Sequence, residues 1–267
     1  MEALLCQLAS RTGAPADNAA RAVDAIRAHP DVDIAVFPEL YLSGYSCRNL
    51  DRVARARDDD DVMTVRRAAA DAGTAVVLGF AERLADGFAN SAVLIERDGS
   101  VAAVYRKTQL FGDERRAFVA GDELLVAPLA GRLVAPLVCF DIEFPEPARA
   151  AALAGADLLV TSSANMEPFY VDHEVASKAR AVENRVPHLY ANAVGTSGAL
   201  VFVGGSRIVS PLGDVVAEGP RDREALIVAT VPEGTPVDAR VDYLRVLEPP
   251  PPVRVLQAAV SRGGLDE

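Results

Sequence analysis

The chain has 267 residues, half of them apolar, and a formal net charge of −11 at pH 7. This length accommodates one large α/β domain, and the apolar fraction is sufficient for a substantial buried core. The acidic balance argues against a nucleic-acid-binding surface, because such a surface needs a basic patch. No stretch approaches the roughly 18 uninterrupted apolar residues of a membrane span, and no signal peptide is evident. We therefore expect a cytoplasmic protein without membrane contact.

Cysteine and histidine usage gives no indication of a metal site. The three cysteines are Cys6, Cys47 and Cys139. They lack CxxC spacing, which argues against a disulfide framework or a zinc site, and their odd number fits a reducing compartment. The three histidines are dispersed, so no metal and no cofactor is expected. His173 lies between Asp172 and Glu174 on a predicted helix, and we expect it to be exposed.

The first half of the chain alternates short apolar runs with segments of helical period. A helix over 16–28 is expected to be capped by Asp17, and residues 40–50 and 111–122 are expected to be irregular. Further elements are a helix over 60–72, strands over 3–8, 33–37 and 74–80, and a hairpin of 89–96 with 101–105 across Asp98 and Gly99.

The second half continues this alternation, which argues for an α/β fold. Helices are predicted over 146–154 and 170–184, and strands over 133–138, 157–162, 188–193, 206–210, 215–218 and 225–230. Periodicity alone does not distinguish one doubly wound sheet from two packed sheets. After Pro232 the chain becomes proline-rich, with four prolines at 249–252. We expect one domain over 1–232 and a tail over 233–267.

Three apolar runs end at residues that could carry chemistry. The strand over 133–138 ends at Cys139, where a following helix dipole would favour thiolate. A cysteine in an apolar run is often only a small buried hydrophobe. However, Glu39 follows the strand over 33–37, and Lys107 follows the second strand of the hairpin. Open α/β sheets bind their ligands at such strand ends.

These residues lie in three stretches, 36–45, 105–114 and 133–149, which together resemble the nitrilase superfamily of carbon–nitrogen hydrolases. The resemblance implies that Glu39, Lys107 and Cys139 form the catalytic triad and that Glu114 is the second glutamate of the family. It also implies a four-layer α-β-β-α sandwich, with two six-stranded sheets packed face to face and helices outside. The tail would then contact a partner subunit in a homodimer or higher homo-oligomer. The segment with Arg180, Glu183 and Asn184 resembles a family signature that would pack under the active site.

The resemblance implies amide hydrolysis through a thioester on Cys139. Glu39 would transfer protons, with a pKa raised by burial. Lys107 and a backbone N–H at or just after Cys139 would stabilise the oxyanion. Glu114 would hold Lys107 in place and accept a hydrogen bond from the amide nitrogen of the substrate.

An amidase that acts on a primary carboxamide is therefore the first hypothesis. A nitrilase or an N-carbamoyl hydrolase of the same superfamily is the alternative, and a non-catalytic binding protein of this fold is the alternative from another class. A redox-sensing thiol protein is also conceivable, although no resolving cysteine is evident near Cys139. Motifs of other enzyme classes are absent: GxSxG, HExxH, GxxxxGK[ST] and GxGxxG.

The residues after the nucleophile bear on the substrate. Phe140 and Asp141 stand where nitrilases typically have Trp-Glu, and Ile142 and Glu143 stand where N-carbamoyl amino acid hydrolases have two arginines. An acid at this place would repel a substrate carboxylate. We therefore expect a neutral or amine-bearing amide, unless Glu143 points to solvent as a helix N-terminal residue. The acyl pocket is expected to include Tyr45, Phe140, Glu143 and Asn165.

Overall fold

The computed structural model describes residues 1–233 and 243–248 of the chain. The expected tail over 233–267, including its four prolines, therefore lies almost entirely outside the described residues. Within them, α7 (Tyr243–Val246) places Tyr243 against the guanidinium of Arg185, 4.4 Å from the ring centroid. No helix in this part of the chain is long and apolar enough to span a membrane.

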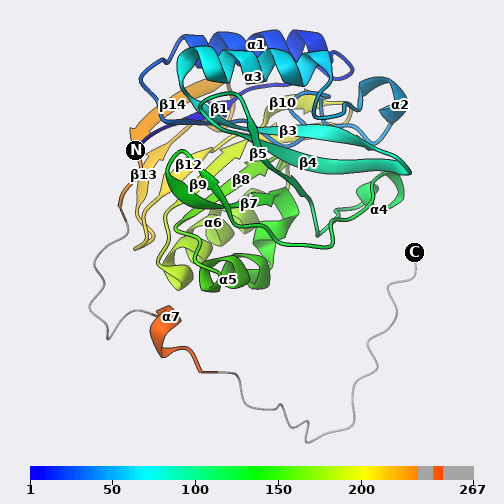
Figure 1. Cartoon of the computed structure of the whole chain (residues 1–267). Helices are drawn as coiled ribbons and strands as arrows, with labels where there is room; N and C mark the ends of the chain where they lie inside the picture. The colour runs from blue at the N-terminus through cyan, green and yellow to red at the C-terminus, as the bar shows by residue number, and fades with distance from the viewer. Residues whose placement is uncertain (234–242, 249–267) are drawn as a thin grey trace, which may run out of the picture.

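Two six-stranded sheets form the centre of the molecule, as the resemblance implied (Figure 1). The first sheet has the order β14-β1-β2-β3-β4-β5, and the second has the order β13-β12-β9-β8-β7-β6. In the first sheet the strands are β1 (Glu2–Gln7), β2 (Ile34–Val36), β3 (Ala75–Leu84), β4 (Gly87–Ile95), β5 (Val101–Arg106) and β14 (Ala225–Thr230). In the second they are β6 (Ala127–Leu129), β7 (Arg132–Val138), β8 (Leu158–Ser163), β9 (His188–Asn192), β12 (Arg207–Val209) and β13 (Val215–Glu218).

Alternating side chains along the strands produce the four layers. On β1, Leu4 and Cys6 pack against the apolar faces of α1 (Pro15–Arg27) and α3 (Asp60–Ala72). Ala3 and Leu5 point the other way, into a core shared with the second sheet. On the far side of that sheet, Ala135 and Leu137 pack against α5 (Pro145–Leu153) and α6 (Tyr170–Asn184). The expected α-β-β-α sandwich is confirmed (Figure 1).

The beginning of α1 differs from the expectation. The helix begins at Pro15, which has the fixed φ suited to a first helical position, and Ala14 is its N-cap residue. Asp17 therefore lies within the first turn, where its carboxylate pairs with Arg11 at 3.0 Å. The expectation that Asp17 caps this helix was wrong.

Several short elements were not predicted. The strand β6 and the hairpin of β10 (Val194–Ser197) with β11 (Leu200–Val203) were missed, as was α2 (Leu50–Val53). The region around Glu114 was expected to be irregular, but it contains the one-turn helix α4 (Glu114–Ala117). This helix contributes to the site described next.

Candidate active site

Cys139 is located at a sharp corner between β7 and a short 3-10 helix, η1 (Cys139–Glu143). Its φ of 45° lies in the left-handed region, which residues other than glycine seldom adopt. The backbone N–H groups at the start of a helix lack intrahelical acceptors, so that of Phe140 is available to a ligand beside the sulfur. The corner therefore presents a thiol next to a free donor.

Asp141 fastens this corner to the segment that carries Lys107. Its buried carboxylate accepts hydrogen bonds from the Val138 N–H at 2.9 Å and the Gln109 N–H at 2.8 Å. The hydroxyl groups of Thr108 and Tyr105 also donate to it, at 3.0 and 2.8 Å. Four donors from two segments thus meet on one carboxylate. The sequence analysis did not identify this role of Asp141.

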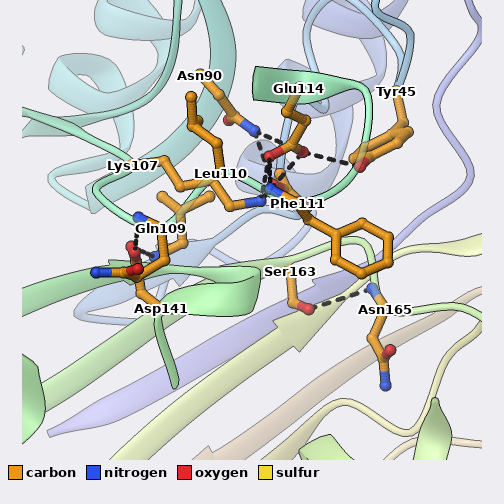
Figure 2. Close-up of polar contacts among 12 residues, drawn as sticks. Tyr45, Asn90, Lys107, Gln109, Leu110, Phe111, Glu114, Asp141, Ser163 and Asn165 are labelled. Atoms are coloured by element: carbon orange, nitrogen blue, oxygen red, sulfur yellow. Dashed lines mark hydrogen bonds and ion pairs between the residues drawn. The ribbon is translucent and has the colours of Figure 1, made fainter. Parts of the chain in front are cut away.

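Lys107 follows β5 and is fully buried between two glutamates. Its Nζ lies 2.6 Å from Glu39 Oε1. It also lies 2.8 Å from Oε2 of Glu114, which Figure 2 shows beside it. Burial alone would lower the pKa of Lys107, but the charges of Glu39, Cys139 and Glu114 outweigh it and raise the pKa above its ordinary value. Lys107 is therefore a fixed ammonium at neutral pH.

Glu39 comes two residues after Phe37, just beyond β2, and its carboxylate is buried. Oε1 accepts hydrogen bonds from Lys107 and from Asn90 Nδ2 at 2.7 Å. Oε2 is buried and has no hydrogen-bond partner among the described residues. Burial raises the pKa of Glu39 to about 7, although Lys107 lowers it in part. A carboxyl group that titrates near neutrality is suited to proton transfer.

Gly79 on β3 allows this placement of Glu39. A Cβ atom at position 79 would come within 2.2 Å of the Pro38 carbonyl oxygen and 2.9 Å of Glu39 Cα. Since real Cβ atoms do not approach a backbone so closely, another residue at position 79 would push the strand end that carries Glu39.

Glu114 is the first residue of α4 and is also buried. Its Oε1 accepts a hydrogen bond from the Tyr45 hydroxyl at 2.8 Å, and its Oε2 accepts one from the Phe111 N–H at 3.0 Å (Figure 2). Asn90 Nδ2 lies 3.3 Å from Glu114 Oε1 and so bridges the two glutamates. The sequence analysis missed Asn90, a single amide within the strand β4.

The pKa of the Cys139 thiol differs from the expectation of a stabilised thiolate. Burial, and then the charge of Glu39, raise the pKa of Cys139 well above its ordinary value. Lys107 and hydrogen bonds from Ser163 and from the Ala164 backbone lower it only in part. The expected stabilisation of thiolate by a helix dipole does not prevail, because η1 is a single short turn. The sulfur therefore needs a base.

The pocket above Cys139 contains all four residues expected near the acyl group, Tyr45, Phe140, Glu143 and Asn165. It also contains residues that the sequence analysis did not place there: Phe111, Met166, Phe169 and His173. The rings of Phe111 and Phe140 meet edge to face, with centroids 5.3 Å apart. The pocket is therefore walled by aromatic rings and contains one carboxylate.

The expectation that His173 is exposed was wrong. Only 2% of the residue is accessible, and its Nε2 lies 3.2 Å from Glu143 Oε1. Its Nδ1 lies 2.9 Å from the Tyr190 hydroxyl on β9. Asp172 and Glu174 project from other faces of α6, because neighbours in a helix are about 100° apart. The Glu143 carboxylate thus contacts the buried imidazole of His173 and is also partly exposed to solvent.

Arg180 on α6 supports the same corner from beneath. Its Nε donates to the Ile142 carbonyl at 2.8 Å and its Nη2 to the Glu143 carbonyl at 3.0 Å, while Nη1 pairs with Glu183. These contacts fix the C-terminal end of η1 by binding its free carbonyl groups. Among the described residues, no group of three His, Cys, Asp or Glu side chains is arranged to hold a metal ion.

Comparison with known proteins agrees with this geometry. The family model described as carbon-nitrogen hydrolase matches residues 3–239. The chain belongs to the carbon–nitrogen hydrolase family. This hydrolase acts on carbon–nitrogen bonds other than peptide bonds, and the resemblance to the nitrilase superfamily is confirmed.

Its relatives include amidases of known sequence and structure. An (R)-stereoselective amidase from a Pseudomonas species is 40% identical over 231 residues, which cover 85% of this chain and 84% of that protein. A variant of the amidase from Nesterenkonia sp. AN1, with acrylamide added at its active-site cysteine, is 32% identical, with a TM-score of 0.82 and coverage of 92% and 96%. Another variant of that enzyme binds butyramide; it is 33% identical, with a TM-score of 0.80 and coverage of 91% and 92%. The first hypothesis, an amidase that acts through a cysteine, is confirmed.

Proposed function

We propose that this carbon–nitrogen hydrolase converts a small primary carboxamide and water to a carboxylic acid and ammonia, with Cys139 as nucleophile. The observation that carries the proposal is the buried ammonium of Lys107, which is held by Glu39 and Glu114 and whose charge acts on the thiol of Cys139. A fixed positive charge in a site shielded from water stabilises a developing oxyanion strongly.

The first half-reaction forms a thioester. The Cys139 sulfur attacks the amide carbon while its proton passes to Glu39, whose Oε2 has no other partner among the described residues. The ammonium of Lys107 and the Phe140 N–H stabilise the tetrahedral oxyanion. Glu39 then gives the proton to the departing nitrogen, the carbon–nitrogen bond breaks, and ammonia leaves. Glu114 accepts a hydrogen bond from the amide nitrogen and thereby orients the substrate.

The second half-reaction returns the free enzyme. Glu39, again ionised, takes a proton from a water molecule that attacks the thioester carbon. The carbon–sulfur bond of the second tetrahedral intermediate breaks, the proton returns to the sulfur, and the carboxylic acid leaves. One buried carboxyl group with a pKa of about 7 serves both half-reactions.

We infer that the acyl group is neutral or bears an amine, because Glu143 lies in the pocket and would repel a carboxylate. This disfavours N-carbamoyl amino acids as substrates. The butyramide complex of the Nesterenkonia amidase variant supports a small aliphatic acyl group here. We further propose a cytoplasmic homodimer or higher homo-oligomer, in which the tail over 233–267 contacts the partner subunit.

The test measures ammonia released from butyramide, butyronitrile and an N-carbamoyl amino acid. We expect turnover of butyramide above that of the other two, and none by Cys139→Ala. Cys6→Ala and Cys47→Ala serve as matched controls and should keep most of the activity. Substantial turnover by Cys139→Ala would contradict the mechanism, and a preference for the nitrile would favour a nitrilase.

A further inference from the structure

Glu143 places one carboxylate in the acyl pocket. It is the last residue of η1, the turn that begins with Cys139, and both residues contribute to the pocket wall. Its side chain is 28% exposed, so the carboxylate contacts the pocket as well as solvent. Arg180 fixes the Glu143 carbonyl but directs its charge to Glu183, at 2.9 Å. The Glu143 carboxylate is therefore not neutralised by the nearest guanidinium.

His173 holds Glu143 without cancelling its charge. Burial lowers the pKa of His173, so its imidazole is neutral at pH 7. A carboxylate only accepts hydrogen bonds, and this assigns the proton of His173 to Nε2, 3.2 Å from Glu143 Oε1. The Tyr190 hydroxyl then donates to Nδ1 at 2.9 Å. One Glu143 oxygen is thus engaged by a neutral donor rather than by a cation.

Aromatic rings line the same pocket as the Glu143 carboxylate. Phe111 packs edge to face against Phe140 and also against Phe169, with centroids 5.3 and 5.7 Å apart. The negative faces of aromatic rings attract cations, and apolar walls strengthen the attraction between opposite charges by excluding water. A carboxylate among phenylalanine rings is suited to bind a substituted ammonium group.

We propose that Glu143 and the surrounding rings form an ammonium subsite, which selects primary amides with a protonated amino group on the α or β carbon. Glu143 is then a specificity-determining residue, and His173 is a positioning residue that orients it. The amide of such a substrate lies at Cys139 while its ammonium group pairs with Glu143, four residues further along the same turn. This inference rests on the proposed function, because it concerns the acyl side of the same site.

Two isosteric pairs test the subsite at pH 7, below the amino pKa of about 8 in an α-amino compound. Alaninamide, each enantiomer separately, is compared with isobutyramide, and β-alaninamide with butyramide. We expect kcat/KM of the better ammonium substrate to exceed that of its isostere by about tenfold or more, the usual effect of a hydrogen bond to a charged group. In Glu143→Gln the preference for each ammonium substrate over its isostere should disappear.

Glu146→Gln is the matched control, since it removes the same charge from an exposed position on α5 outside the pocket. It should keep the preference, and Glu143→Asp should restore part of it. Equal hydrolysis of both members of each pair, unaffected by Glu143→Gln, would overturn the subsite and leave the amidase proposal intact. Absence of hydrolysis of any amide would overturn both. Thermal unfolding of each variant verifies the fold.

Discussion

At the scale of single residues, the ionisable groups of the site differ in whether their charge changes near neutral pH. Lys107 remains charged, Cys139 remains a thiol because burial and the charge of Glu39 raise its pKa, and Glu39 titrates at about 7. Of these three groups, Glu39 is the one that changes its charge near neutral pH. The thiol can react when Glu39 is ionised and ready to accept the proton.

The first prediction follows from this titration. Because the base must be ionised, kcat/KM for butyramide should rise with pH, with a midpoint near 7, and level off above it. The measurement is a pH–rate profile of ammonia release. In Glu114→Gln the midpoint should move to lower pH, because the negative charge of Glu114 is one of the causes that raise the pKa of Glu39. A midpoint that moves to higher pH would contradict the assignment.

The second prediction concerns acylation. Glu39→Gln should form no acyl adduct with butyramide, because an amide side chain can neither accept the thiol proton nor donate a proton to the departing nitrogen. Intact-protein mass spectrometry after substrate addition measures the adduct. Acrylamide is the control, since a variant of the Nesterenkonia amidase shows its Michael addition at the active-site cysteine. Addition of a thiol to the carbon–carbon double bond does not require the amide nitrogen to leave. A full butyryl adduct on Glu39→Gln would refute the proposed role of Glu39.

The sequence indicated Glu39, Lys107 and Cys139 at three strand ends, but it did not indicate the residues that position them. Glu39, Lys107 and Cys139 each interrupt an apolar run, which made them visible. Asn90 and His173 act through partners distant in the chain, such as Tyr190 on β9. No local pattern encodes such contacts, so only the folded structure brings them together.

At the scale of elements, Asp141 connects η1 with the segment after β5. The third prediction is that Asp141→Asn lowers the free energy of unfolding by about 2–4 kcal/mol, because an amide cannot accept all four donors of a buried carboxylate. Urea unfolding measures this loss. Turnover of butyramide should also fall, because Cys139 and Lys107 are no longer held in their relative positions.

Asp113→Asn is the control for this prediction. Asp113 precedes α4 on the same segment, but its side chain is 88% exposed and pairs only loosely with Arg116 at 3.8 Å. Its replacement should change stability by less than about 0.5 kcal/mol. Equal losses in the two variants would show that Asp141 does not connect the two segments.

Elements with a clear apolar or helical pattern were predicted better than those without one. The helices Asp60–Ala72 and Tyr170–Asn184 and the strands Val215–Glu218 and Ala225–Thr230 have the expected bounds. The elements α4 and β6 were missed, because their sequences, ERRA and APL, show neither a helical period nor a continuous apolar run. Their conformation depends on packing: α4 exists where Glu114 is held by Tyr45 and Lys107.

At the scale of the whole molecule, two sheets share one core and two helix pairs cover the outside (Figure 1). The outer surface of α5 and α6 retains large exposed apolar side chains, Leu153, Val171 and Val175. Such side chains on neighbouring helices are typical of a surface that becomes buried between subunits.

The fourth prediction is that the protein is at least a dimer through this surface. Light scattering at micromolar concentration should give at least twice the mass of one chain. Val171→Glu combined with Val175→Glu should shift it toward the monomer, because burying two charges in an apolar interface is costly. Val201→Glu, an exposed valine on β11, is the control. A monomeric mass for the unmodified chain would refute the prediction.

The left-handed backbone at Cys139 sets stability against activity. A residue with a Cβ atom costs about 1–2 kcal/mol in this conformation, and glycine avoids that cost. The fifth prediction is that inactive Cys139→Gly unfolds at a higher temperature than inactive Cys139→Ala, measured by calorimetry. If the order were reversed, the corner would hold no strain. With the predicted order, selection for heat resistance alone would favour glycine at this position, so the cysteine persists only where turnover is selected as well.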